Sequence, residues 1–353
     1  MLKLEYPRLW FSQIVGRKRT KPWKYFPVDG VLMNAYDFMQ HPTIFEEVSC
    51  DGIHNLLEFK GPIMMDSGGF LFMKKNIVDV NAKQIISFYE ETKPNFGVIL
   101  DHPILTSLPS NEIRKRQLET LKNTKTMIKN RTTKNPVLVP VIHGHTPQDI
   151  RWYLKQLKKI DTFQLYGIGS LVPSLYNVSG VGGILNVVKI IHQVRKKLPK
   201  AKLHVFGTGS ALTMHLMFYA GVDSLDTSSW RTKAAFGAIQ MSGMGDRWIS
   251  SALRKKPYPQ LSRKEKKVLN NCCCPACKKH GMEGLRTTFT LRAIHNAWIY
   301  QKEIQKTRKM MKNNRYEEYV ERIMNKTKFA SLFASIKKIR KSESYTSILH
   351  NDT

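Results

Sequence analysis

The feature that most constrains the fold is a repeated alternation of short apolar runs with amphipathic stretches. Six runs, rich in β-branched residues, predict buried strands at residues 61–66, 96–101, 136–144, 162–170, 202–210 and 221–226. They are almost wholly apolar, as strands covered on both faces should be. Amphipathic patterns between them predict helices at residues 81–93, 111–130, 146–160, 182–198 and 211–221. Strands that alternate with helices in this way indicate a parallel sheet.

Each predicted strand ends in polar residues or glycine. These endings are Asp66, Asp101, His143, Gly167 to Ser170, Gly207 to Ser210, and Asp226. In a (β/α)8 barrel the carboxyl ends of all strands meet at one mouth, where active sites lie. An open doubly wound sheet would bring ligands to a single switch point instead. Polar endings on six successive strands favour the α/β class with a (β/α)8 barrel. The two remaining strands are expected in the first 60 residues, in 24–35 or nearby.

The alternation stops after about residue 250, which predicts three parts. We expect a (β/α)8 catalytic barrel at residues 1–255, a zinc-binding subdomain packed on it at 256–311, and a basic helical C-terminal tail at 312–353. Within the second part, a helix is predicted from about Thr290 to Met311. The last ten residues are expected to be frayed.

Four of the five cysteines cluster in one short segment. Cys272, Cys274 and Cys277 follow the spacing Cys-x-Cys-x-x-Cys, and His295 comes eighteen residues later on a predicted helix. Three thiolates and an imidazole form a closed tetrahedral site for a structural Zn²⁺ ion. Alternatives are a cluster of free thiols beside a core histidine, Cys273 in place of a neighbouring cysteine, or His280 in place of His295. This distribution is unlike a secreted disulfide scaffold and favours a reducing cytoplasm.

The charge is strongly positive, with 57 Lys and Arg against 27 Asp and Glu and a net charge of +30. Any one basic run is best interpreted as a solvated helix face. Their sum destabilises a compact state by self-repulsion unless a polyanion offsets it. The sequence therefore predicts a nucleic-acid partner. The N-terminus has no apolar signal region, and no run is long enough to cross a bilayer, so no membrane partner is expected.

The segment Gly-Pro-Ile-Met-Met-Asp-Ser-Gly-Gly-Phe carries a charge out of a buried strand at Asp66. Ser67, Gly68 and Gly69 follow, and the bare glycine backbone allows a flat ligand to approach closely. Asp226 would reach the same barrel mouth from a strand far away in the sequence. Two carboxylates that face one bond can divide a retaining glycosyl transfer at a sugar C1′, because one attacks while the other handles protons. The alternative for each aspartate is an ordinary cap or loop acid.

Other residues of the predicted mouth could contact a purine. Asp101 could hydrogen-bond the base edge, or it could be a strand-end acid satisfied by backbone amides. Gly167 and Gly169 could bring bare backbone to a heterocycle, or they could form a tight turn. Phe70 could stack on a base or belong to the core. Residues 207–210 lack the Lys of a phosphate loop and are interpreted as a turn that lines the mouth.

Five motifs together resemble the tRNA-guanine transglycosylases. They are DSGGF at 66–70, IGSLVP at 168–173, HVFGTGS at 204–210, GVDSLDTSSW at 221–230, and the cysteine motif with HN at 295–296. The resemblance covers roughly residues 60–300 and is closer to the archaeal-type branch, because DTSSW is similar to its Asp-Ser-Ala-Ala-Tyr pattern. It implies a (β/α)8 barrel with a structural zinc subdomain. It also implies that guanine in a polynucleotide is exchanged for a free 7-deazaguanine base by double displacement, without ATP or a redox cofactor.

The resemblance implies a role for each matching residue. Asp226 matches the nucleophile that takes the sugar C1′, and Asp66 matches the general acid/base. Asp101 matches the acid that reads the guanine edge, and Phe70 matches the aromatic residue that stacks on the base. Residues 167–168 lie where backbone groups contact the base. The zinc ligands of the family correspond to Cys272, Cys274, Cys277 and His295.

Two departures from the family pattern shape the functional prediction. His143 stands in the base-reading position where the family usually has Gln, and a basic helical tail follows the zinc segment in place of further RNA-binding domains. This profile looks like the 7-deazaguanine DNA transglycosylases, so we predict exchange of guanine in DNA for a base such as 7-cyano-7-deazaguanine. The target nucleotide must then be flipped out or single-stranded. Alternatives are the same reaction on tRNA, or a non-catalytic zinc-stabilised nucleic-acid-binding protein. The resemblance is compatible with a homodimer, although the sequence identifies no interface.

Overall fold

The computed structural model describes residues 4–16, 19–75, 77–171, 181–207, 209–251 and 258–341. Nine strands form one parallel sheet in the order β5-β4-β3-β2-β1-β9-β8-β7-β6. They are β1 (Arg8–Ser12), β2 (Val31–Asn34), β3 (Ile63–Asp66), β4 (Phe96–Val98), β5 (Val137–Val139), β6 (Val141–Ile142), β7 (Leu165–Ile168), β8 (Lys202–Val205) and β9 (Ser224–Thr227).

The sheet closes into a ring at Pro140. This residue separates β5, which pairs with β4, from β6, which pairs with β7. Proline has no N–H to give to the ladder, but its carbonyl accepts a 2.8 Å hydrogen bond from the Gly167 N–H. Because β5 and β6 thus occupy one position, the ring has eight positions, and the predicted (β/α)8 barrel is confirmed. The two remaining strands are β1 and β2: β2 lies within the expected segment 24–35, whereas β1 lies before it, still within the first 60 residues.

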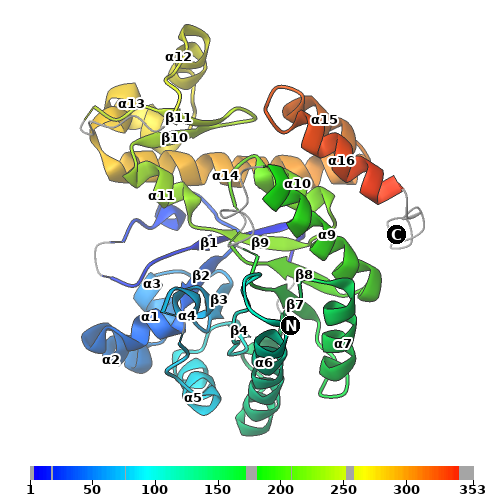
Figure 1. Ribbon diagram of the computed structural model, residues 1–353. Helices are drawn as coiled ribbons and strands as arrows, with labels where there is room; N and C mark the ends of the chain where they lie inside the picture. Colours follow the sequence, from blue (N-terminus) through cyan, green and yellow to red (C-terminus); the bar gives the residue numbers. More distant parts are fainter. Residues whose placement is uncertain are drawn as a thin grey trace.

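Helices surround the barrel (Figure 1). They are α1 (Ala35–Met39), α2 (Pro42–Asp51), α3 (Ile53–Leu57), α4 (Gly69–Lys75), α5 (Ala82–Thr92), α6 (Ser110–Asn130), α7 (Pro147–Leu157), α9 (Val181–Lys197), α10 (Thr213–Tyr219) and α11 (Ser229–Ala235), with a short 3₁₀ turn at Pro22–Lys24. Side-chain caps explain the starts of α1, α5 and α7. The Thr146 side chain accepts the Asp149 N–H at the start of α7, where Pro147 fills the first turn. The five helices predicted between strands are all present.

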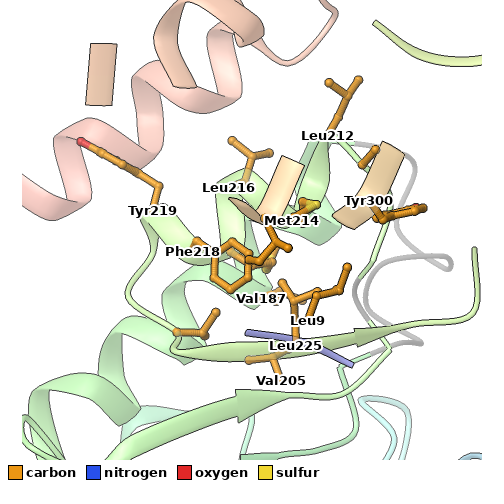
Figure 2. Packing of buried hydrophobic residues seen from close by; sticks show 14 of the residues in the cluster. Leu9, Val187, Val205, Leu212, Met214, Leu216, Phe218, Tyr219, Leu225 and Tyr300 are labelled. Atoms are coloured by element: carbon orange, nitrogen blue, oxygen red, sulfur yellow. The ribbon is translucent and has the colours of Figure 1, made fainter. Parts of the chain in front are cut away.

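The strand periodicity of two divides the core into two layers. Trp10 of β1 lies inside the barrel with Leu32, Met64, Phe96, Val98, Val139, Val141 and Leu165. Its neighbour Leu9 lies outside, in the layer between strands and helices. Figure 2 shows this outer layer, in which side chains of the strands pack against Val187 of α9 and Phe218 of α10. Because apolar side chains fill both faces of the strands, polar residues that could bind or react with a ligand lie at the strand ends.

The C-terminal part is built around one long helix, α14 (Phe289–Lys312). A hairpin of β10 (Ala238–Met241) and β11 (Gly245–Trp248) lies near one end of it with α12 (Arg263–Asn270) and α13 (Pro275–Thr287). Near the other end are α15 (Tyr316–Met324) and α16 (Ala330–Lys341) (Figure 1). The predicted boundary at 255/256 and the final ten residues lie outside the described residues. Among the residues described, no helix is both long and apolar enough to span a membrane.

Candidate active site and metal centre

Three carboxyl groups from three strands reach the barrel mouth. Asp66 ends β3, Asp101 follows β4, and Asp226 lies in β9. Asp66 is only partly exposed, and burial raises the pKa of its carboxyl group to about 8. The negative charges of Asp101 and Asp226 contribute to this rise, and backbone N–H groups of Gly68 and Ser67 offset part of it. The Asp66 carboxyl group is therefore mostly protonated at neutral pH and can donate a proton or a hydrogen bond.

Asn34 holds the Asp66 carboxyl group from the neighbouring strand. The register of β2 and β3 places these two residues opposite each other, and Asn34 Nδ2 donates to Asp66 Oδ2 at 3.2 Å. The Asn34 side chain is itself fixed, because its Oδ1 accepts the Asp37 N–H at the start of α1. Asp66 is thus supported by a side chain that the fold has already oriented.

Asp226 receives a hydrogen bond on each carboxylate oxygen. Ser12 Oγ donates to Oδ2 at 2.6 Å, and the Gly207 N–H donates to Oδ1 at 2.7 Å. On the inner side, His204 Nε2 lies 3.6 Å from Oδ1. Asp226 is only 7% exposed. These contacts fix the orientation of the carboxylate, which suits a group that must attack along one direction.

Asp101 lies against the glycine loop and against a histidine. It is 5% exposed, and its Oδ2 lies 3.0 Å from His143 Nε2. A Cβ on Gly69 would come within 2.9 Å of Asp101 Oδ1. A side chain at position 69 would therefore displace this carboxylate.

Packing and backbone conformation explain most of the other residues of the DSGGF loop. Ser67 is completely buried, and Gly68 has a φ of +135°, which favours glycine. A Cβ there would also lie 2.7 Å from the Tyr36 Cβ. Phe70, by contrast, is 46% exposed on α4. The two glycines are needed for packing whatever the ligand, whereas Phe70 is an exposed aromatic residue outside the core.

Gly167 of β7 and Gly169, which follows this strand, leave room for ring side chains beside the backbone. The Gly167 N–H donates to the Pro140 carbonyl, and the ring of Phe206 occupies the space that a Cβ on Gly167 would need. The Gly169 N–H donates to Ile142 O at 3.2 Å, and its missing Cβ leaves room for the His143 ring. Ile168 between them is buried in the outer core layer. The amide protons of both glycines therefore belong to the barrel ladder, and the predicted backbone contacts to a base stay a prediction.

The cysteine cluster forms a compact donor set. Ligand atoms of Cys272, Cys274, Cys277 and His295 all lie within 4.8 Å of one another. His295 Nδ1 faces the sulfurs at 3.4–3.7 Å, and its Nε2 lies 3.0 Å from Gln240 O. One ring nitrogen toward the metal and the other on a carbonyl is the usual arrangement of a metal-bound histidine.

Three sulfurs and one nitrogen fit a tetrahedral Zn²⁺ ion. The alternatives in the sequence do not join this group, since Cys273 and His280 are both exposed and outside it. The cluster joins α14 to the start of α13, because His295 of α14 faces the sulfurs of Cys274 and Cys277 there. A metal ion would therefore cross-link the part of the chain that follows the barrel.

Comparison with known proteins identifies the family. The family described as queuine tRNA-ribosyltransferase matches residues 21–328. The chain belongs to this family.

Its relatives include three proteins named tRNA-guanine(15) transglycosylase. The protein from Methanopyrus kandleri is 26% identical over 301 residues, which are 84% of this chain and 61% of the relative. That from Methanococcus aeolicus is 28% identical over 82% of this chain and 43% of the relative. The protein from Pyrococcus furiosus is 26% identical over 83% of this chain and 47% of the relative. The chain thus spans about half the length of these queuine tRNA-ribosyltransferase relatives. The predicted family is confirmed, but nothing in these matches supports the DNA-acting branch.

Three residues that support the site of this queuine tRNA-ribosyltransferase family member were missed in the sequence. Ser12 ends β1, which no apolar run had placed, and Asn34 ends β2, inside the segment 24–35 where a strand was expected. His204 lies in the motif HVFGTGS, in a predicted strand, but the sequence analysis gave it no role in the site. A polar residue on the inward face of a predicted barrel strand was the available signal for His204. No comparable signal exists for Ser12 and Asn34, because their contacts with the two aspartates depend on how neighbouring strands pair.

Proposed function

We propose that the protein is a guanine transglycosylase that exchanges guanine in tRNA for a free 7-deazaguanine base. The observation that carries this proposal is the contrast between two carboxyl groups at one mouth. Asp226 has a donor on each oxygen, whereas the pKa of Asp66 is raised to about 8. Carboxyl groups held in different protonation states are suited to different tasks in one reaction.

In the first step an Asp226 oxygen attacks C1′ of the sugar. The bond from C1′ to N9 breaks, its electron pair goes to guanine, and the protonated Asp66 carboxyl group supplies the proton that makes guanine a neutral leaving group. Asp66 is then an ionised carboxylate. In the second step it takes the N9 proton of the incoming base while N9 attacks C1′. The bond from Asp226 to C1′ breaks, and both carboxyl groups return to their starting states.

The base would lie between Phe70 and the buried carboxylate of Asp101. Phe70 is exposed at the start of α4 and offers an aromatic face for stacking. Asp101 can accept the N1–H and the 2-amino group of guanine. A 7-deazaguanine has the same two donors, so the leaving and the incoming base can occupy one site in turn. The Cys272, Cys274, Cys277 and His295 group would hold Zn²⁺, which would supply a structural cross-link.

The choice of tRNA rests on the relatives, whose names specify tRNA-guanine(15) transglycosylase. The net charge of +30 supports a polyanion in general. DNA, the substrate predicted from the sequence, stays a prediction that these relatives do not favour. A homodimer and the three-part division at residues 255/256 and 311/312 are likewise proposals.

Base exchange tests the proposal directly. Purified protein is incubated with labelled guanine and, in separate reactions, with tRNA, single-stranded DNA and duplex DNA. Asp226→Ala is the test variant. Asp161→Asn is a matched control, because this acid precedes β7 at the opposite end of the barrel and bonds only its neighbour's N–H among the contacts described.

We expect label in tRNA with the wild type and the control, and none with Asp226→Ala. Label in DNA alone would restore the DNA prediction. Binding of polynucleotide without exchange, unchanged in Asp226→Ala, would favour the non-catalytic alternative instead.

A further inference from the structure

His143 is enclosed by protein on every side. Its side chain has no exposed surface. The edge of Tyr153 from α7 faces the ring with centroids 6.3 Å apart, and Gly169 lies so close that a Cβ would be 3.0 Å from His143 Cε1. Gln117 of α6 donates to the His143 carbonyl at 2.8 Å. The ring therefore cannot turn to meet a ligand in the mouth, although the sequence placed it in a base-reading position.

A chain of hydrogen bonds leads from the backbone to Nδ1 of this ring. The Ile104 N–H donates to Ser170 Oγ at 2.9 Å, and Ser170 Oγ lies 3.0 Å from His143 Nδ1. Because the amide can only donate, the serine hydroxyl keeps its own proton and can give it to Nδ1. With Nδ1 as the acceptor, Nε2 carries the ring proton.

Asp101 is the acceptor that lies beside the Nε2 proton. Nε2 is 3.0 Å from Asp101 Oδ2, and this buried nitrogen makes no hydrogen bond among the residues that the structure describes. Leaving a buried donor unpaired is costly. Contacts of this kind in an active site tighten when the substrate is in place.

We propose that His143 is a positioning residue that holds the Asp101 carboxylate through Oδ2 and thereby sets the preference for bases with a 2-amino group. This inference rests on the proposed function. With Oδ2 held, Oδ1 faces the glycine loop at Gly69 and is the oxygen that the base meets. A fixed, buried carboxylate disfavours a base that lacks the 2-amino group, because the lone pair that would accept from this group is left unpaired even when N1–H still donates. His143 acts only through Asp101 and makes no contact with O6 of the base.

Two base analogues separate this role from direct reading. Hypoxanthine lacks the 2-amino group but keeps N1–H and O6, whereas 6-thioguanine keeps both donors and changes only the acceptor at C6. Binding is measured by equilibrium dialysis of labelled guanine in competition with each analogue. In the wild type we expect guanine to bind roughly 10- to 100-fold more tightly than hypoxanthine.

In His143→Ala we expect guanine to bind roughly 10- to 100-fold more weakly and the preference over hypoxanthine to fall toward 1. The preference for guanine over 6-thioguanine should equal that of the wild type. Ser170→Ala should move the hypoxanthine ratio in the same direction by less, and it serves if His143→Ala does not fold. His145→Ala is the matched control, since it removes a histidine of the same loop with no described contact to Asp101 and should keep both wild-type ratios.

Three outcomes would contradict this inference. A hypoxanthine ratio unchanged in both His143→Ala and Ser170→Ala, with wild-type melting temperature, would overturn the positioning role. A changed 6-thioguanine ratio would mean that His143 reads O6 itself. If the wild type binds no guanine, the proposed function fails and the inference fails with it, whereas the first two outcomes leave the proposed function standing.

Discussion

Ser12 and Asp226 are 214 residues apart in the chain, yet Ser12 Oγ donates to Asp226 Oδ2 at 2.6 Å. The contact exists because β1 and β9 are neighbours in the closed ring, with Trp10 opposite Asp226. The Ser12 carbonyl is held in turn by Trp230 Nε1 at 3.2 Å. The end of β1 is thus a rigid support for the proposed nucleophile.

Removing this support should slow the first chemical step. We expect Ser12→Ala to lower kcat roughly 10- to 100-fold, because a hydrogen bond to a charged group contributes about 1.5–3 kcal/mol. The check is single-turnover formation of the covalent protein–tRNA adduct. Thr232→Ala is the control, since its exposed hydroxyl bonds only the Ser228 carbonyl in the described structure. Equal adduct rates in both variants would contradict the supporting role of Ser12.

Asp66 predicts a pH dependence of guanine release. The group must be protonated in the first step, and burial together with two nearby carboxylates raises its pKa to about 8. Guanine release in a single turnover should therefore fall about tenfold per pH unit above pH 8. Asp66→Asn should be slow at every pH, with this fall absent, while Asp161→Asn should follow the wild type. A wild-type rate that still rises between pH 8 and pH 9 would exclude Asp66 as the acid.

The raised pKa of Asp66 should also make the free energy of unfolding depend on pH. The folded-state pKa of Asp66 lies above its ordinary value of 3.8, so the folded protein binds this proton more strongly than the unfolded chain. The contribution is fully present below about pH 4 and is lost as pH rises to about 8. Urea unfolding of the wild type and of Asp66→Asn across this range should show the wild type losing stability relative to the variant. A difference that is constant with pH would contradict the shift.

The sequence could predict the barrel because its strands are buried on both faces and so appear as apolar runs. It could not place β1, which begins with the charged Arg8 and ends with Ser12. Asp66 and Asp226 were found as acids that follow apolar strands. Their supports were not, because Ser12 and Asn34 meet them only through strand register. The sequence placed His143 at the end of a barrel strand. It could not show that the His143 ring is buried and contacts Ser170, because both depend on the packing of α6 and α7.

The metal centre predicts a defined stoichiometry. Elemental analysis of the purified protein should give about one zinc per chain, because three cysteines and one histidine complete a four-coordinate site. Cys277→Ser should lose the metal and lower the melting temperature, as should prolonged treatment with a chelator. Cys273→Ser and His280→Ala are matched controls that should keep the full content. Loss of zinc in either control would mean that the ligand set is wrong.

A buried network joins the barrel to the helices that follow it. Glu303 of α14 is 1% exposed, and its carboxylate contacts His215 Nε2 of α10 at 3.1 Å and Tyr319 OH of α15 at 2.6 Å. Burial alone would raise the pKa of Glu303, but donors from His215, Ser242 and Tyr319 lower it to about 2. The folded state therefore favours the ionised form.

Cutting this network should destabilise the whole chain. Glu303→Ala leaves a buried histidine without its partner, and we expect a loss of about 3–5 kcal/mol in the free energy of unfolding. Glu318→Ala, which removes an exposed partner of Arg315, should cost less than about 1 kcal/mol. Because the folded pKa of Glu303 is depressed, its contribution is present above about pH 4.5 and lost as pH falls toward 2. Urea unfolding at pH 7 and pH 3 should therefore show a smaller difference between wild type and Glu303→Ala at pH 3, and an equal difference would contradict the lowered pKa of Glu303.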